Sequence, residues 1–172
     1  MGFDVESMEL RDALDLAILM EEEARLRYTE FARQVGGRYP GDAADVFRLM
    51  AAYEEKHGAQ LVARRRSLFK DQPRRVSLDQ LDDLEAPDRG EPRVFMSARD
   101  AMQVAIAAEV KAYEFFDAAV NLVTDPGVRA LFAELRAEEA EHRRLLEERI
   151  VDLPHGPDML EVEADQPGSD PG

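Results

Sequence analysis

The sequence predicts an all-α protein, a four-helix bundle made of two duplicated helical hairpins joined by a long crossover. Two observations lead to this fold class. First, the stretches at about 8–35, 43–70, 98–122 and 126–150 are rich in Ala, Leu, Glu and Arg, with almost no internal Gly or Pro. Second, their apolar residues recur at helical spacing, and nothing reads as a strand.

Start and stop signals mark the ends of these helices. The Gly36-Gly37 pair is expected to end the first helix, because glycine is the residue most often found just beyond a helix. N-caps are expected at Ser7, at Asp42, at Ser97 in a capping box with Asp100, and at Asp125 before Pro126.

The connections set the topology. The links at 36–42 and 123–125 are short, so each joins antiparallel neighbours and makes a hairpin. The segment 71–96 is much longer and is predicted to cross over along a bundle about 40 Å long. One helical turn is expected within it, through Leu78, Leu81 and Leu84.

We expect a single domain. The bundle with its crossover is predicted to span 1–153. The remaining 154–172 are rich in Asp, Glu and Pro and contain no Lys or Arg, so they are expected to form a disordered tail. A docking peptide is the functional alternative for this tail.

Composition excludes several classes of function. With no Cys there is no disulfide, thiolate zinc site or iron-sulfur cluster in this sequence. A net charge of −15 argues against nucleic acid and anionic membranes as partners, since both favour basic surfaces. No apolar run is long enough for membrane insertion, and no targeting segment is visible, so a cytoplasmic protein is expected.

Each predicted helix has one apolar seam interrupted by acidic or imidazole side chains. In alternating steps of four and three, the first seam has Glu21 among apolar or small residues, and the third has Glu109 at the matching place. The second and fourth seams each contain a Glu-x-x-His motif at matching places, Glu54 with His57 and Glu139 with His142. One such motif is a weak signal, but two in register on duplicated seams are not expected by chance.

Six polar residues in one core layer require a counter-charge. Buried carboxylates without a partner are very unfavourable, and four together would also repel one another. The nearest basic seam residues, Arg64 and Arg149, are about 10 Å further along their helices. Two divalent ions would balance the charge. The predicted metal ligands are Glu21, Glu54, His57, Glu109, Glu139 and His142.

The remaining polar residues near this layer have simpler interpretations. Acidic residues beside the ligands are expected to form a solvated face, with an iron path or outer site as the alternative; they are Glu22, Glu23, Glu55, Glu138 and Glu141. Tyr53 and Tyr113 are off the seams and are expected to be packing or interface residues.

With this layer and the run Glu-Glu-Glu-Ala-Arg-Leu-Arg-Tyr from Glu21 to Tyr28, the sequence resembles the ferritin-like superfamily, and within it the rubrerythrin group. The resemblance implies a site with two iron ions, with manganese or a mixed pair as alternatives. It also implies that Glu54 and Glu139 bridge the metals and that Glu21 and Glu109 are terminal ligands. Tyr28 matches the tyrosine that these proteins place near the carboxylates, and it is the candidate catalytic residue.

Two features depart from that group. Rubrerythrins commonly have another Glu three residues after the ligand of the third helix, where this chain has Ala112. They also have a rubredoxin domain with cysteine ligands, which this sequence lacks, so the resemblance is to an erythrin-like protein. Both departures put a complete peroxidase cycle in question.

The leading functional interpretation is a non-haem di-iron oxidoreductase that reacts Fe(II) with hydrogen peroxide or oxygen, as a peroxidase or ferroxidase, with a separate electron donor if it turns over. The alternative is non-catalytic iron binding, storage or delivery. A homodimer is expected, since Leu16, Leu19, Val104 and Ile106 are predicted to lie outside the core layer and need cover. Two chains could also exchange hairpins.

Overall fold

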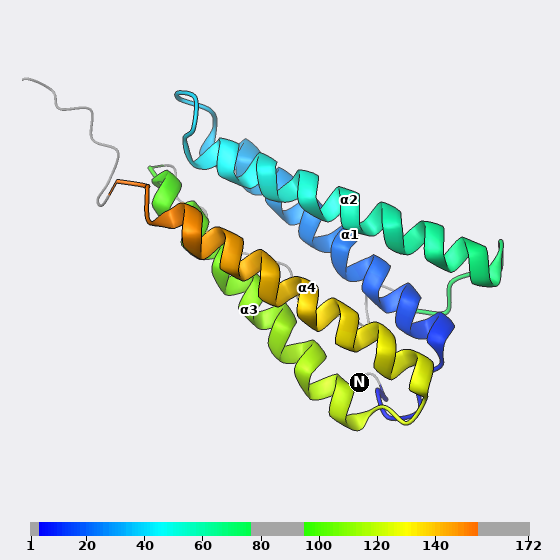
Figure 1. Ribbon diagram of the computed structural model, residues 1–172. Coiled ribbons are helices and arrows are strands. Elements are labelled where there is room, and N and C mark those ends of the chain that lie inside the picture. The colour runs from blue at the N-terminus through cyan, green and yellow to red at the C-terminus, as the bar shows by residue number, and fades with distance from the viewer. Residues whose placement is uncertain (1–3, 77–94, 155–172) are drawn as a thin grey trace, which may run out of the picture.

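The computed structural model describes residues 4–76 and 95–154. Helices α1 (Leu10–Val35), α2 (Ala43–Phe69), α3 (Ala98–Leu122) and α4 (Pro126–Ile150) form an elongated bundle (Figure 1). The described residues include no strand, so the all-α fold class is confirmed. The tail beyond Pro154 and the turn expected through Leu78, Leu81 and Leu84 lie outside the described residues.

Most of the predicted helix ends are confirmed. Asp42 accepts hydrogen bonds from the backbone N–H groups of Ala44 and Asp45, and Asp125 accepts them from Gly127 and Val128. Ser97 forms the expected capping box with Asp100. Gly36 ends α1 with φ of 64°, a conformation that glycine adopts without strain.

The predicted cap at Ser7 is wrong. The Ser7 hydroxyl donates to Asp4 at 2.6 Å, so it serves a turn that precedes the helix. Helix α1 begins only at Leu10, after Glu9, whose side chain makes no capping hydrogen bond. Met8, between Ser7 and Glu9, is buried in the core. Packing of Met8 therefore sets the path of the chain into α1.

The connections give the predicted topology. Helices α1 and α2 run antiparallel along each other, as do α3 and α4 (Figure 1). Helix α2 ends at one end of the bundle and α3 begins at the other, so the two helices run in the same direction. A crossover between them has to return along the bundle, which accounts for its length.

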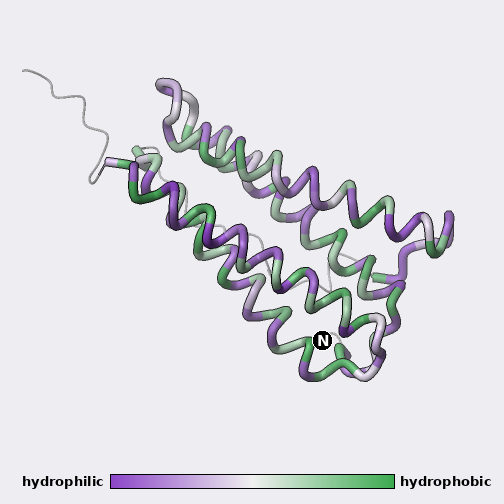
Figure 2. The backbone as a smooth tube through the Cα atoms, viewed as in Figure 1, coloured by the Kyte–Doolittle hydropathy of each residue, from purple (hydrophilic) through white to green (hydrophobic). Residues whose placement is uncertain are grey.

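Hydrophobic and hydrophilic residues alternate along every helix (Figure 2), and the buried apolar residues form two clusters. One cluster includes Leu14, Phe116 and Phe132, and the other includes Phe31 and Phe47. The expected seam residues supply most of both clusters. The charged seam residues lie in a layer between the two, and this position isolates them from bulk water.

Helix α1 is more buried than the sequence predicted. Every residue from 13 to 20 is buried, including Leu16 and Leu19, which we expected to lie outside the core. Val104 and Ile106 on α3 are half-buried. The reason for expecting a partner chain is therefore weaker at α1 than at α3.

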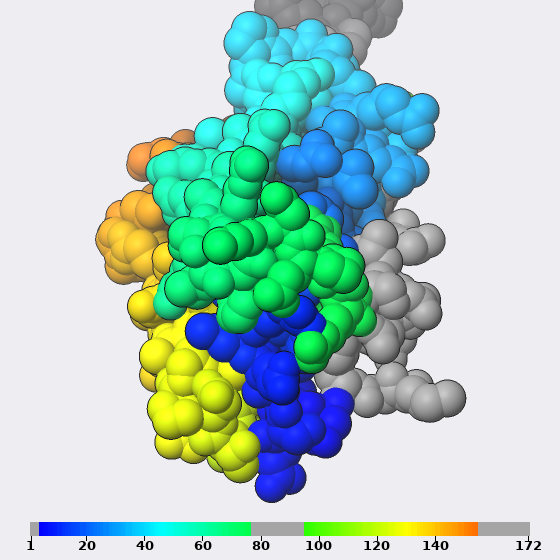
Figure 3. Space-filling view, turned by 90° about the vertical axis from the view of Figure 1, so that its right-hand side faces the viewer, coloured from blue at the N-terminus to red at the C-terminus, as the bar shows by residue number. Residues whose placement is uncertain are grey.

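A buried ion pair ties the start of the crossover to α1. Asp15 is completely buried and accepts hydrogen bonds from the Arg65 guanidinium and from the backbone N–H of Arg75. Arg65 also donates to the carbonyl of Gln72 at 2.9 Å. Figure 3 shows the end of α2 and the segment after it (green) lying over the beginning of α1 (blue). These contacts hold residues 72–75 on α1.

None of the helices in the described part of the chain combines the length and the apolar character that crossing a lipid bilayer requires.

Candidate metal centre

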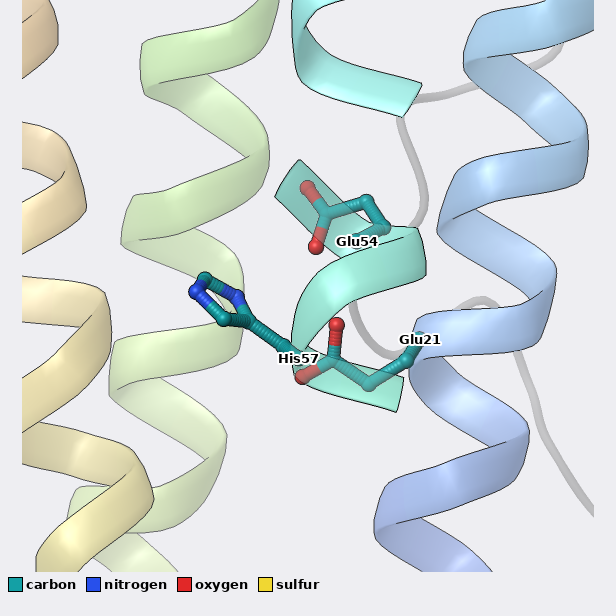
Figure 4. Close-up of side chains that lie close together, drawn as sticks. All are labelled: Glu21, Glu54 and His57. Carbon is teal, nitrogen blue, oxygen red and sulfur yellow. The ribbon is translucent and has the colours of Figure 1, made fainter. Parts of the chain in front are cut away.

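The predicted ligands form two groups, one on each hairpin. The first half-site consists of Glu21 from α1 with Glu54 and His57 from α2 (Figure 4). The second half-site consists of Glu109 from α3 with Glu139 and His142 from α4. Within each half-site, the three ligand atoms lie within 4.8 Å of one another. Each half-site can therefore bind one metal ion.

The two half-sites adjoin through their histidines. The rings of His57 and His142 stack with centroids 4.4 Å apart and an interplanar angle of 1°. His57 points from α2 away from α1, toward the second hairpin (Figure 4). Glu54 and Glu139 are also close enough that each charge acts on the other. All six residues thus lie in one layer, as predicted.

Local sequence explains this placement. Residues three apart lie on the same side of a helix, so Glu54 and His57 both face the layer, and Glu139 and His142 do the same on α4. Glu21 and Glu109 occupy the middle of otherwise apolar seams and are carried inward by the burial of their neighbours. The four carboxylates are at most 4% exposed, whereas the His142 side chain is 19% exposed.

In the second half-site, the imidazole holds a proton. His142 Nδ1 lies 3.3 Å from a carboxylate oxygen of Glu109 and 3.4 Å from one of Glu139. Burial alone would lower the pKa of His142, but these two carboxylates raise it to about 10. Burial raises the pKa of Glu109, and the nearby Glu139 adds to this effect while the hydrogen bond with His142 opposes it.

In the first half-site, Glu54 binds a proton more readily than His57 does. Burial raises the pKa of Glu54 to about 7, although a hydrogen bond from Glu21 opposes the increase. Burial and the positive charge of His142 lower the pKa of His57 to about 4. Without metal, therefore, protons provide the counter-charge that the carboxylates need.

The donor set fits a pair of divalent metal ions. Four carboxylates and two imidazoles offer oxygen and nitrogen ligands without thiolate, which suits iron or manganese. Arg64 pairs with Glu134, and Arg149 lies over the Tyr53 ring, so both guanidinium groups have partners outside the layer. Two divalent ions would replace the protons and balance four carboxylates.

The structure places Tyr28 within the core beyond the first half-site. Its side chain is 1% exposed and its ring stacks on Phe47 with centroids 6.1 Å apart. Tyr28 lies two helical turns after Glu21 on the same face of α1, which is about 10 Å along the axis. Ala112, one turn after Glu109 on α3, is fully buried.

Contacts between α2 and α4 on either side of the histidines were not predicted from the sequence. Glu138, predicted on a solvated face, is exposed, and Tyr53, predicted to be a packing or interface residue, is half-buried. In the structure, Arg64 of α2 pairs with Glu134 of α4, and Arg149 of α4 covers Tyr53 of α2. The sequence places Arg64 and Arg149 on the ligand seams, but it does not show which residues of the facing helix they contact.

The fold and the layer define a class of protein, the ferritin-like four-helix bundles with a carboxylate and histidine site for two metals. Residues 12–150 match the rubrerythrin family, and the chain belongs to that family.

Solved structures agree with this assignment. The chain is 31% identical to an uncharacterized conserved protein from Magnetospirillum magnetotacticum MS-1, with 87% of this chain and 98% of that one covered and a TM-score of 0.67. Rhodobacter capsulatus bacterioferritin has the same fold, at 21% identity, a TM-score of 0.54 and coverage of 88% and 87%. A hypothetical protein from Pyrococcus furiosus is also similar in fold, at 21% identity, a TM-score of 0.54 and coverage of 84% and 89%. No curated protein matches the sequence.

Proposed function

We propose that this protein is a di-iron oxidoreductase that reacts Fe(II) with hydrogen peroxide or oxygen. The observation that carries the proposal is the buried layer in which both half-sites meet through stacked imidazoles. Two bound iron ions would supply one electron each, which is enough to cleave the O–O bond of hydrogen peroxide into two waters or to reduce oxygen to peroxide.

The residues of the chain have distinct parts in this proposal. By the resemblance to rubrerythrins, Glu54 and Glu139 would be the ligands shared by both ions, while Glu21 and Glu109 would each bind one. His57 and His142 would each add a nitrogen ligand, after His142 gives up the proton that it shares with Glu109 and Glu139. The two apolar clusters cover the layer from both ends and keep its four glutamates buried.

Tyr28 is the proposed catalytic residue. A buried phenol can donate a hydrogen bond to a carboxylate or to a reactant in the core. The reduced state would be restored by a donor from outside these residues, because the sequence has no Cys to hold an electron-transfer centre.

Ala112 favours a second candidate function. Without a carboxylate at that position, the two half-sites offer equivalent ligands. Position 112 then provides no further carboxylate that could replace a ligand when the metals change oxidation state. A symmetric site of this kind suits plain oxidation and uptake of Fe(II) as substrate, for storage or delivery. Iron recovered far in excess of two ions per chain would support this alternative.

The deciding experiment is anaerobic loading with Fe(II), followed by stopped-flow mixing with peroxide or with oxygen. We expect peroxide to oxidise the loaded protein faster. Equal or faster oxidation by oxygen would contradict the peroxidase proposal and support ferroxidase activity.

We also propose that the chain forms a homodimer, either between intact bundles or with exchanged hairpins. Half-buried Val104 and Ile106 support this proposal. A monomer of 19.4 kDa by light scattering at micromolar concentration would contradict it.

A further inference from the structure

The metal layer is accessible to solvent at its two histidines. Its four glutamates are at most 4% exposed, whereas His142 has 19% of its side chain exposed and His57 is half-buried. Since His57 belongs to α2 and His142 to α4, the opening lies between these two helices. We call this opening over the stacked imidazoles the α2–α4 window.

Two contacts between the same helices border the window. On one side, the Arg64 guanidinium of α2 donates to Glu134 of α4. On the other side, Arg149 of α4 lies 6.0 Å from the centre of the Tyr53 ring of α2. Because both contacts join α2 to α4, the open part of the layer is confined to the two imidazoles.

One carboxylate beside the window, that of Glu138, has no hydrogen-bond or ion-pair partner among the described residues. Glu138 is exposed on α4 and experiences the charges of Glu139, His142, Glu134 and Arg64. Among the residues that the structure describes, Glu138 makes neither a hydrogen bond nor an ion pair. The Arg64 charge, in contrast, is already matched by Glu134. A cation approaching the imidazoles therefore meets Glu138 as an available anion.

Duplication of the hairpin does not account for this carboxylate. At the place in the first hairpin that corresponds to Glu138, the chain has Tyr53. The charge of Glu138 on α4 thus has no counterpart at the matching position of α2. On the other side, Lys56 lies close enough for its positive charge to act on His57.

Resting on the proposed metal centre, we propose that divalent metal ions reach it through the α2–α4 window, and that Glu138 is the positioning residue that draws them onto the imidazoles. An incoming ion approaches Glu138 first and then passes to the histidines and the buried glutamates. Glu138 acts on the rate of binding, because the six ligands alone hold the ions at equilibrium.

The test measures the association of Co(II) with the metal-free protein by stopped-flow absorbance at low ionic strength. Co(II) requires no redox reaction, so the readout is independent of peroxidase or ferroxidase activity. We expect Glu138→Gln to slow association about threefold to tenfold and Glu138→Asp to restore most of the rate. The final Co(II) content of two ions per chain should stay the same, and added salt should reduce the difference.

Two other substitutions provide matched controls. Glu141→Gln removes the same charge from a residue that is likewise exposed and next to a ligand on α4, but Glu141 is already bound by Arg144. We expect the Glu141→Gln rate to stay within twofold of the original. Lys56→Gln should accelerate Co(II) binding, because it removes a positive charge near His57. Thermal unfolding of each variant checks that the fold is retained.

The outcomes separate the access route from the proposed function. Equal slowing by Glu138→Gln and Glu141→Gln, or no slowing by either, with normal Co(II) content would overturn the access route alone. Failure of the unaltered protein to bind Co(II) would overturn the metal centre and the access route with it.

Discussion

The two half-sites have the same ligands in the same register, yet they hold protons differently. The pKa of His57 is lowered to about 4, and that of His142 is raised to about 10. His142 lies within 3.4 Å of two carboxylates and takes the proton, and its charge then disfavours a second proton on the ring stacked against it. Without metal, two sequence-equivalent half-sites therefore cannot be electrostatically equivalent.

The protonation difference indicates how metal binding would change the charge distribution of the layer. One shared imidazolium and protonated carboxyls keep the metal-free layer folded, but in an asymmetric state. Two divalent ions would give both half-sites equivalent surroundings, because each half-site offers one imidazole and glutamates at matching positions. We therefore expect the symmetry of the sequence to be a property of the metal-bound site.

The strongest way to break the equivalence is to remove a glutamate proposed to bridge. We expect Glu54→Ala and Glu139→Ala each to abolish binding of both ions, although each substitution lies in only one half-site. Glu21→Ala and Glu109→Ala should each remove one ion. Metal analysis of the purified variants measures this, with circular dichroism as the control for folding. Retention of one ion in Glu54→Ala would contradict the bridging assignment.

A second difference between the hairpins is the buried ion pair of Asp15 with Arg65. The position corresponding to Asp15 in the second hairpin is Gln103, which is exposed. We expect Asp15→Ala to destabilise the protein by about 3–5 kcal/mol, because it leaves Arg65 buried without its counter-charge. Gln103→Ala should change stability by less than about 0.5 kcal/mol. Urea unfolding compares the two variants, and similar midpoints would refute the structural role of this pair.

The protonation difference predicts how metal-free stability depends on pH. Since the folded state raises the pKa of Glu54 to about 7 and of His142 to about 10, both groups contribute stability at low pH that is lost as the pH rises. His57, with its pKa lowered to about 4, acts in the opposite direction below its ordinary value of 6.5. The net loss between pH 6 and 8 is expected to be about 2 kcal/mol.

Thermal unfolding of the metal-free protein at pH 6 and pH 8 tests this dependence. Saturating Mn(II) should reverse its sign, because the ligands must lose their protons to bind metal. Glu54→Gln, which cannot ionise, should flatten the metal-free dependence. A metal-free protein that became more stable from pH 6 to pH 8 would contradict the proton assignments.

The smallest expected effect concerns Tyr28, whose counterpart in the second hairpin is Phe116. Tyr28→Phe makes the hairpins alike at this position and removes one buried hydroxyl. We expect the rate advantage of peroxide over oxygen to fall a few-fold, with two metal ions still bound. Stopped-flow oxidation of the Fe(II)-loaded variant measures this. An unchanged ratio would show that Tyr28 only fills the core.

The fold and the arrangement of the metal layer were predictable because both follow from helical periodicity. Side chains in the middle of a seam are buried together with their apolar neighbours, so the burial of Glu21 and Glu109 could be predicted from the sequence. The same applies to Glu-x-x-His, where one turn of helix fixes which two side chains share a face. Asp42 and Asp125 were predictable as caps for an equally local reason.

Features that depend on distant segments were not predictable. Leu16 and Leu19 appeared to need a partner chain, but they are buried within this one. Ser7 looked like a cap, but the packing of Met8 delays the start of the helix. The protonation difference between His57 and His142 was hidden for another reason, since matched sequence positions do not show which ring is nearer to carboxylates.

Because residues 13–20 of α1 are buried on all sides, this helix is expected to be the last to open during native-state fluctuations. Helix α4 is different, since its buried residues form a single stripe and the rest of its surface faces outward. Amide hydrogen exchange should therefore be slowest in α1 and faster in α4. Transient opening of α4, while α1 keeps its form, would then widen the α2–α4 window from one side and leave the ligands of the first hairpin in place.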